Sequence, residues 1–388
     1  MSQLLARFKA LGRDLRLLWV AIFCLNFGFG IYSAVFYNFA TESLRIRPEQ
    51  LGYVEAVREL PGFLCVGVAA IAAQIAEPLL GSIALFLMGV GMAAYAIVHG
   101  IPTLLVFSFV WSIGFHSWMP LQSSLVLNLA RKNIKGKRLG QTLGVSSIGA
   151  VAGMLVVRIV GHGLAYPQWF VFGSISIILA ALTMLPIRRD ICHPAKPNLV
   201  LKPRYKLYYG LTFLEGCRKQ VFMTFAIYAL TKVYHTHLRT VALLMIINNI
   251  VNIFGGPIVG KMIDKIGEKR ILMTSYSALI LVFLGYATIH REHALFALYC
   301  LDNFFYLSTT CLTTYLQKIA DPADLTPTLS MGVTFNHAAA VLVPLIGGFL
   351  WAKLGYSVTF FGGAAVVAVS LLLASRVRPA KADAAVSG

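Results

Sequence analysis

The sequence predicts an all-α membrane protein whose twelve transmembrane helices form two pseudo-symmetric bundles of six. Of its 388 residues, 58% are hydrophobic and only 12% are charged. Soluble domains carry about 25% charged residues, so this composition indicates a chain embedded in lipid. Apolar runs long enough to cross a bilayer, about 20 residues each, recur from end to end. A weak similarity between the two halves also repeats at a shift of about 190 residues, the signature of an internally duplicated membrane protein.

The expected spans follow one another closely, and their short connections leave no room for a separate soluble domain. They lie at 17–40, 51–75, 79–98, 102–128, 139–163, 168–186, 206–232, 239–263, 271–289, 293–318, 328–353 and 356–377.

The basic residues set the expected orientation. The formal net charge is +18, and 23 of the 33 Lys and Arg fall in segments that this topology places inside, against six outside. Positive residues stay on the cytoplasmic side of a membrane, so both termini are expected in the cytoplasm. The membrane expected is a bacterial inner membrane. The excess charge is therefore explained by topology and by contact with anionic lipids, and no nucleic-acid partner is expected.

The repeat divides the chain into an N-terminal six-helix bundle, a linker and a C-terminal six-helix bundle, expected at 1–187, 188–205 and 206–388. At a shift of 190, Ala40-Thr41-Glu42 meets Leu230-Thr231-Lys232. The linker is rich in Pro and charge, as hinge segments between domains are.

The segment between the eighth and ninth spans carries an eleven-residue motif, G-x-x-x-D-[RK]-x-G-x-[RK]-[RK]. Its fixed positions are Gly260, Asp264, Lys265, Gly267, Lys269 and Arg270. In this motif the chain resembles the major facilitator superfamily of secondary transporters. The resemblance implies a monomeric, alternating-access solute carrier without cofactor or catalytic activity, in which these residues form a gating loop. The first half lacks the Asp and the basic pair at 70–80, which implies that the second-half loop carries more of the gating.

Ionisable groups inside the spans are the best indicators of function, because a charge at the bilayer centre costs at least ~2.5–3.5 kcal/mol. The resemblance implies that spans 1, 4, 7 and 10 line a central cavity. Arg218 and Lys219 lie in span 7 with Glu215 three residues before Arg218, so Glu215 and Arg218 share a helical face. Arg218 is either an intrahelical ion-pair partner or an anion ligand. Lys219 leaves these three residues with one net positive charge, which favours an anionic substrate.

Two carboxylates are candidates for proton coupling, Glu59 in span 2 and Asp302 in span 10. Glu59 and its neighbour Arg58 diverge around the helix, and Glu55 lies one turn away as an alternative partner for Arg58. A carboxylate in a low-dielectric setting holds protons more readily, which is what coupling requires. The alternatives are a fixed ion pair for Glu59 and a helix-bridging role for Asp302.

Further polar residues at similar depth are expected to shape the pocket. They are Asn26, His116, Asn303, Asn336 and His337.

Together these features predict secondary active transport of a small, anionic organic solute, coupled to protons. The partners expected are the solute, protons and membrane lipids, with no metal site. The main alternative is a proton antiporter that exports drug-like or cationic compounds, with the buried carboxylates as counter-charges. A membrane enzyme is less favoured, because no nucleophile lies at helical spacing from a general base. A transport-derived scaffold is also less favoured, because only a carrier explains the loop motif.

Overall fold

A computed structural model describes residues 11–72, 75–130, 134–190 and 201–377, and within these ranges the chain is helical with no strand. Several segments discussed above lie outside the described residues. They are the basic N-terminal segment 1–10, residue Gln74 at the first-half counterpart of the loop motif, most of the predicted linker (191–200) and the C-terminal residues 378–388.

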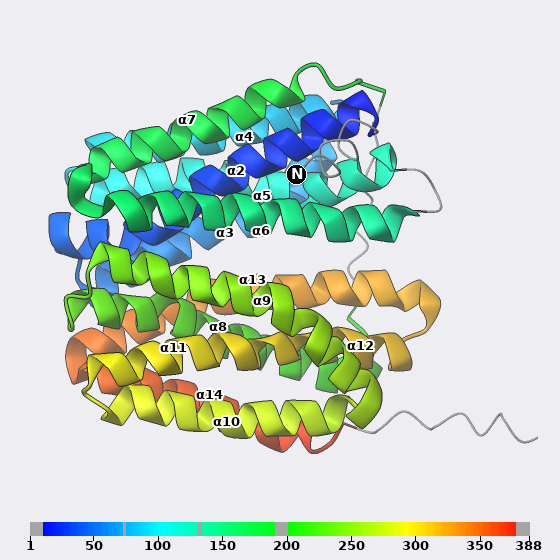
Figure 1. Cartoon of the computed structure of the whole chain (residues 1–388). Helices are drawn as coiled ribbons and strands as arrows, with labels where there is room; N and C mark the ends of the chain where they lie inside the picture. The colour runs from blue at the N-terminus through cyan, green and yellow to red at the C-terminus, as the bar shows by residue number, and fades with distance from the viewer. Residues whose placement is uncertain (1–10, 73–74, 131–133, 191–200, 378–388) are drawn as a thin grey trace, which may run out of the picture. The chain divides into compact units, whose positions relative to one another are not determined.

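The first half folds into six membrane-length helices (Figure 1). They are α2 (Arg13–Asn38), α3 (Pro48–Ala72), α4 (Glu77–Ala93), α5 (Ile101–Leu129), α6 (Lys135–Val160) and α7 (Tyr166–Met184). Short 3-10 or π turns extend three of them, at Phe39–Ser43, Ala94–Ile97 and Gly161–Gly163.

The second half repeats the arrangement after a short 3-10 turn at Pro203–Tyr205. Its helices are α8 (Lys206–Lys232), α9 (Leu238–Ile266), α10 (Glu268–Thr288), α11 (Glu292–Tyr306), α12 (Thr310–Ile319), α13 (Pro322–Leu354) and α14 (Tyr356–Ala374). The turn Leu307–Thr309 separates α11 from α12, and the three together form one span-length segment, Glu292–Ile319.

The twelve-helix prediction is confirmed, because a helix covers each expected span. In the described part of the chain, ten of these segments are long and apolar enough to cross a membrane by composition alone. The other two are α3 and α8, which carry the Arg58-Glu59 and Arg218-Lys219 pairs. The helices that fail a purely apolar criterion are therefore those that bring ionisable groups into the membrane.

The described contacts divide the chain into two compact units. Unit 1 contains Met1–Ile46, Val57–Lys196 and His235–Asn249, and unit 2 contains Arg47–Ala56, Pro197–Tyr234 and Ile250–Gly388. Each unit is thus built mainly on one half of the sequence. The first part of α9 belongs to unit 1, and the first part of α3 belongs to unit 2.

Packing within the two units follows one scheme. In unit 1, α2 packs on α6 and α7, and α4 packs on α5 and α7. In unit 2, α8 packs on α13 and α14, and α10 packs on α11 and α14. These pairs correspond helix by helix, so the weak repeat in the sequence is expressed as a strong repeat of packing.

A buried glutamate begins the third helix of each half. Glu77 at the start of α4 accepts a hydrogen bond from Ser124 of α5, at 2.8 Å from each carboxylate oxygen. Glu268 at the start of α10 pairs with Lys318 of α12 at 2.7 Å. In both halves, therefore, a buried glutamate forms a polar contact between the third and fourth helices, here called the glutamate staple. The loop motif itself is absent from the first half.

The loop motif forms the turn from α9 to α10. Gly267 has a φ of 84° and a ψ of 156°, a backbone region that is essentially restricted to glycine. Asp264 is exposed on unit 2 and forms no ion pair with another described residue. The glycine of the motif is therefore required by backbone geometry, which reverses the chain direction between two long helices.

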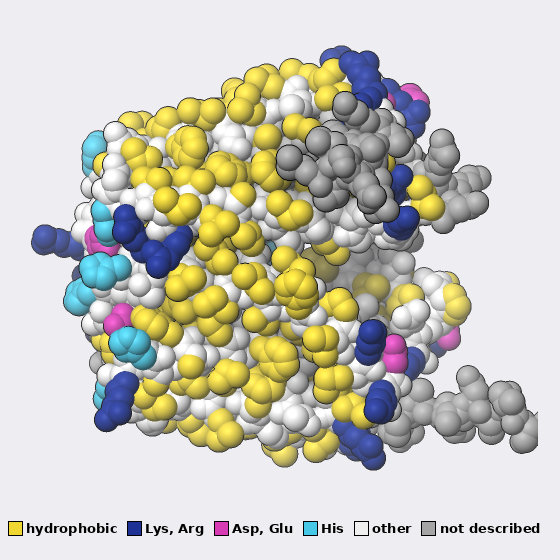
Figure 2. All heavy atoms as spheres, viewed as in Figure 1, with side chains coloured by type: hydrophobic (Ala, Val, Ile, Leu, Met, Phe, Trp, Pro, Cys, Tyr) yellow, Lys and Arg dark blue, Asp and Glu magenta, His cyan; other side chains and the backbone are white. Residues whose placement is uncertain are grey.

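Figure 2 shows the surface expected of a membrane protein. Hydrophobic side chains cover the middle of the visible face, while Lys, Arg and His side chains gather toward the helix ends. Large apolar side chains such as Leu281 (68% exposed), Phe254 (67%) and Leu143 (66%) project outward from the helices. An apolar surface of this extent is typical of a protein that contacts lipid.

Candidate substrate site

A cavity of about 230 Å³ lies within unit 2. Helices α8, α11, α12 and α13 and the turn before α12 line it with hydroxyl, amide and charged groups alongside apolar ones. Its lining residues are Tyr208, Thr212, Glu215, Lys219, Tyr306, Thr309, Leu312, Thr313, Leu329, Gly332, Val333 and Asn336. This mixture of a few polar groups in an apolar wall is typical of small-molecule sites.

One face of α8 supplies the charged wall of the cavity. Tyr208, Thr212, Glu215 and Lys219 follow one another at intervals of four, three and four residues. This spacing places all four side chains on one stripe of the helix. The two hydroxyls were not among the predicted site residues, although the spacing that reveals them is visible in the sequence.

Lys219, a predicted substrate ligand, presents the cationic group of this cavity. Its Nζ lies 5.7 Å from the centre of the Tyr306 ring. Among the described residues it forms no ion pair with any carboxylate. An ammonium group that lines a cavity without a carboxylate partner is chemically able to pair with an anion.

Arg218 is placed differently. Its side chain is 1% exposed and is not part of the cavity wall. Its Nη2 and Nε donate to Glu215 Oε1 at 2.5 and 3.2 Å, and its Nη1 donates to Asp302 Oδ1 at 2.9 Å. Two carboxylates already neutralise the guanidinium. Of the two roles considered for Arg218, its surroundings are therefore those of the intrahelical ion pair with Glu215. The sequence argument that counted one net positive charge did not include Asp302.

Two glycines let polar side chains cross between α8 and α13. A Cβ on Gly332 would lie 2.6 Å from the Tyr208 hydroxyl, and one on Gly216 would lie 2.8 Å from Asn336 Oδ1. Both distances are below any tolerated contact, so each site admits only glycine unless the neighbour moves. The glycines thereby leave room for the Tyr208 hydroxyl and for the predicted pocket residue Asn336, both of which line the cavity.

The other predicted pocket residues lie away from this cavity. Asn303 donates to Asn252 Oδ1 at 3.0 Å, which joins α11 to α9 within unit 2. Asn26 donates to the Ile22 carbonyl of its own helix at 2.7 Å. His337 is half-buried on α13, one residue beyond Asn336.

A second polar cluster lies within unit 1. His116 of α5 is buried, and its Nε2 lies 3.7 Å from Glu59 Oε2 of α3. Its Nδ1 lies 2.9 Å from the Ser112 hydroxyl, which in turn donates to the Arg58 carbonyl. The structure thus brings together two predicted residues from different helices, a carboxylate and an imidazole that form an ion pair when the imidazole is protonated.

Arg58 lies beside this cluster in an aromatic cage. Its guanidinium is 5.0 Å from the ring centres of Phe36 and Trp111 and 5.4 Å from that of Tyr32. Aromatic faces stabilise a cation through their quadrupoles, by ~2 kcal/mol or more when water is excluded. Glu55 is buried on the first part of α3, which belongs to unit 2, and its pairing with Arg58 stays a prediction.

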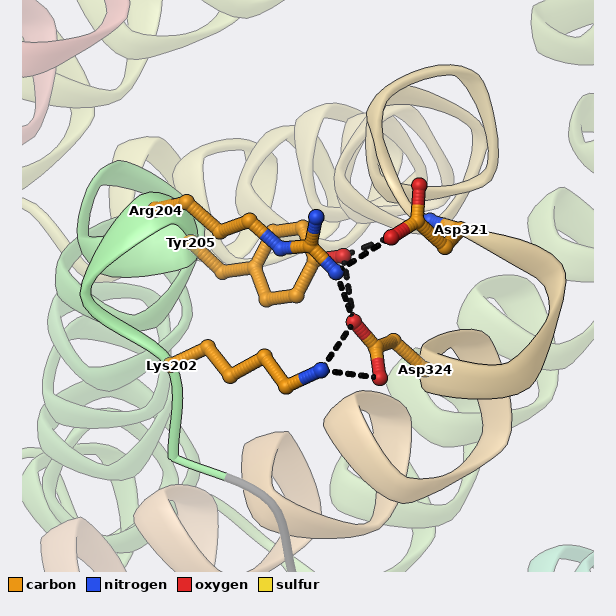
Figure 3. A network of polar contacts seen from close by, with 5 residues as sticks. All are labelled: Lys202, Arg204, Tyr205, Asp321 and Asp324. Carbon is orange, nitrogen blue, oxygen red and sulfur yellow. Dashed lines mark hydrogen bonds and ion pairs between the residues drawn. The ribbon is translucent and has the colours of Figure 1, made fainter.

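A third polar network closes one end of unit 2 outside the cavity (Figure 3). Lys202 donates to both oxygens of Asp324 at 2.8 and 2.9 Å, and Tyr205 donates to the same carboxylate at 2.9 Å. Arg204 bridges Asp324 and Asp321, and these hydrogen bonds raise the pKa of its guanidinium above the ordinary value. The last residues of the predicted linker are therefore fixed to the start of α13.

A helical duplication, a polar cavity within unit 2 and the loop motif between α9 and α10 are together typical of a membrane carrier. The model of the Major Facilitator Superfamily matches residues 208–387, which cover nearly all of the second half. The second half of the chain is therefore similar to the Major Facilitator Superfamily, as the resemblance in its loop motif predicted.

Solved transporters share the fold over the whole chain. A point mutant of the nucleoside transporter NupG superposes with a TM-score of 0.79 at 14% identity, over 94% of this chain and 99% of that one. A bacterial homologue of the human lysosomal transporter Spinster gives 0.74 at 13% identity, over 93% and 96% of the two chains. A point mutant of the peptide transporter POT gives 0.74 at 14% identity, over 93% of each chain.

The chain is also similar in sequence to a multi-drug resistance efflux pump, PmrA of Streptococcus pneumoniae serotype 4 (strain ATCC BAA-334 / TIGR4). The two are 22% identical over 92% of this chain and 94% of the pump.

Proposed function

We propose that this transporter carries a small organic anion, which binds in the unit 2 cavity with its negative group at Lys219. The observation that carries the proposal is a membrane-depth ammonium that lines a cavity and has no carboxylate partner among the described residues. The neighbouring Arg218 is already neutralised, so Lys219 is the cation offered to a ligand. Arg218 then acts as a buried structural cation, not as the ligand first considered.

The size and lining of the cavity support a small, hydrogen-bonding solute. Its volume of about 230 Å³ lies below the ~300–1,000 Å³ common for drug-sized ligands. The hydroxyls of Tyr208, Thr212 and Thr313 and the amide of Asn336 can bond the polar groups of a hydroxylated carboxylate. The proposed substrate class is therefore a small monovalent hydroxy-carboxylate.

The energy source we propose is the proton gradient across a bacterial inner membrane, with both termini in the cytoplasm. The two carboxylates that can exchange protons are Asp302 in unit 2 and Glu59 beside His116 in unit 1. The gating loop around Asp264 and Gly267 would control access at the cytoplasmic side, and the carrier would work as a monomer.

A thermal-shift screen of the detergent-purified protein tests the substrate class. The anions are acetate, lactate, gluconate, benzoate and phosphate, and the cations are choline, tetraethylammonium and tetraphenylphosphonium. A ligand at 100 times its dissociation constant adds about 2.7 kcal/mol to the folded state. We expect stabilisation by a carboxylate in the wild type and in Lys232→Gln, which changes a lysine at the far end of the same helix, but not in Lys219→Gln. Stabilisation by cations alone would contradict the proposal.

The second candidate is export of cationic or drug-like compounds by proton antiport. The relative named as a multi-drug efflux pump favours it, as does the aromatic cluster of unit 1, where Phe29, Trp111 and Phe115 stack beside the Arg58 cage. On this hypothesis Glu59 would be the counter-charge of the cation. Stabilisation by tetraphenylphosphonium that disappears in Glu59→Gln would favour this candidate over the anion carrier.

A further inference from the structure

Lys219 lies one helical turn after a carboxylate with which it does not pair. Glu215 and Lys219 are four residues apart on α8 with the acid nearer the helix start, the order that favours an intrahelical ion pair. Among the residues that the structure describes, this pair does not form: Glu215 Oε1 accepts two N–H groups of Arg218, while Lys219 Nζ lies 5.7 Å from the centre of the Tyr306 ring. The position of the Lys219 ammonium therefore has a cause outside its own helix.

Tyr306 is held beside α8 by the end of its own helix. It is the last residue of α11, and its carbonyl accepts a hydrogen bond at 2.7 Å from the hydroxyl of Thr309 in the turn that follows. Asp302 lies four residues earlier, on the same face of α11, and accepts a hydrogen bond from Arg218 at 2.9 Å. This bond joins that face of α11 to α8, and the Tyr306 ring centre lies 5.3 Å from the Arg218 guanidinium.

We propose that Tyr306 is the positioning residue of the anion site. The face of its ring attracts the Lys219 ammonium, keeps it from pairing with Glu215, and so leaves it available to a solute in the cavity that Tyr306 and Lys219 both line. This inference rests on the proposed anion site and adds to it the residue that prepares the cation for binding.

The physical reason is that a ring and a carboxylate hold an ammonium in different ways. The faces of an aromatic ring are electrically negative, and a cation within about 6 Å of the ring centre is attracted to them. The ring carries no net charge, so the ammonium keeps its own charge, whereas a carboxylate would cancel that charge and occupy its N–H groups. A solute carboxylate can then bind Lys219 without first displacing an acid of the protein, which lowers the cost of binding.

Arg218 weakens the competing acid. Its Nε and Nη2 both donate to Glu215 Oε1, at 3.2 and 2.5 Å, which compensates the charge of that carboxylate. Arg218 is 1% exposed and Glu215 is 5% exposed, so water does not take the place of either partner. The Tyr306 ring therefore competes for the Lys219 ammonium against a carboxylate that is already paired.

The first test removes the ring face and then restores it. The measured quantity is the affinity for the monovalent carboxylate that gives the largest thermal shift in the screen. Tyr306→Leu keeps an apolar side chain without a ring and should lower affinity by at least about tenfold, whereas Tyr306→Phe and Tyr306→Trp should bind nearly as the wild type does. Tyr299→Leu is the matched control: Tyr299 lies on the same helix, where its ring stacks on Phe222, and this variant should keep the wild-type affinity.

A second variant separates positioning from a general structural role. Glu215→Gln keeps an oxygen for Arg218 but has no charge to attract Lys219. Added to Tyr306→Leu, it should restore most of the lost affinity, because the ammonium then has no competing carboxylate on its own helix. Damage to the fold would not be repaired by a second change in the same core, so a double variant that folds and still fails to bind would overturn the inference.

The outcomes distinguish the positioning role from the anion site itself. If Tyr306→Leu binds the carboxylate as the wild type does, while Lys219→Gln does not bind it, the inference is overturned and the anion site stands. If no carboxylate binds the wild type, or if Lys219→Gln binds equally well, the anion site fails and the inference falls with it. If Tyr306→Leu does not fold, Tyr306→Met takes its place as the variant without a ring, and the same outcomes decide.

Discussion

Arg218 and Lys219 are adjacent cations on α8 with opposite surroundings. The Arg218 side chain turns into the protein, where two carboxylates accept its N–H groups, while Lys219 faces the cavity and forms no ion pair with a carboxylate of the described residues. Adjacent positions on a helix differ by about 100° in direction, so neighbours in sequence readily serve different surroundings. Arg218 is therefore part of a buried ion-pair network, and Lys219 is the residue that we propose binds the substrate.

This division predicts that the two alanine substitutions differ in how strongly they destabilise the protein. Arg218→Ala leaves Glu215 and Asp302 buried without their cation, and removal of one member of a buried ion pair costs about 3–5 kcal/mol. Lys219→Ala removes a half-buried cation without a protein partner, so its effect on stability should stay within ~1 kcal/mol. Thermal unfolding in detergent compares the two variants. A Lys219→Ala protein as unstable as Arg218→Ala would show that Lys219 is also structural.

At the scale of elements, the loop between α9 and α10 depends on one backbone conformation. Replacing Gly267 by alanine forces a Cβ into a region with a φ of 84°, which costs about 1–3 kcal/mol. We expect Gly267→Ala to lower the melting temperature and slow transport. Gly260→Ala is the control from the same motif, since a Cβ there meets no atom within 4 Å and alanine favours the helix. Equal effects of the two substitutions would refute a specific conformational role for Gly267.

The network at the start of α13 gives a second prediction at this scale. Asp324 is 6% exposed and accepts hydrogen bonds from three side chains, so Asp324→Asn should destabilise unit 2 by about 1.5–3 kcal/mol. Asp321→Asn changes an exposed carboxylate of the same network and should cost below ~1 kcal/mol. Chemical denaturation of the two variants measures the difference. Identical unfolding midpoints would mean that the network does not anchor the linker.

The helices were predictable from sequence, whereas the partners of their polar groups were not. Length and apolarity suffice to place a helix on each span, because lipid requires every backbone group to be satisfied within the segment. The bond from Arg218 to Asp302 joins positions 84 residues apart, and it depends on how α8 packs against α11. The periodicity of a sequence does not reveal how one helix is turned toward another. The cavity hydroxyls of α8 are the opposite case, since their spacing from Glu215 and Lys219 is visible in the sequence.

At the scale of the whole molecule, duplication has preserved packing and has let chemistry diverge. The helix pairs α2 with α6 and α8 with α13 correspond, as do the glutamate staples at Glu77 and Glu268. The ionisable groups differ: unit 1 has a carboxylate, an imidazole and a caged guanidinium, whereas unit 2 has a cavity with an available ammonium. The scaffold is thus common to both halves, and the anion site that we propose belongs to the second.

Counterflow in liposomes that contain only this protein is the most direct test of the carrier that we propose. The vesicles are loaded with an excess of the stabilising carboxylate and diluted into a trace of the same labelled anion, so that accumulation reports exchange through the protein without any energy source. We expect rapid accumulation with the wild type and with Lys232→Gln, and none with Lys219→Gln. Equal accumulation with Lys219→Gln, or accumulation of labelled tetraphenylphosphonium in place of the anion, would contradict an organic-anion carrier built around Lys219.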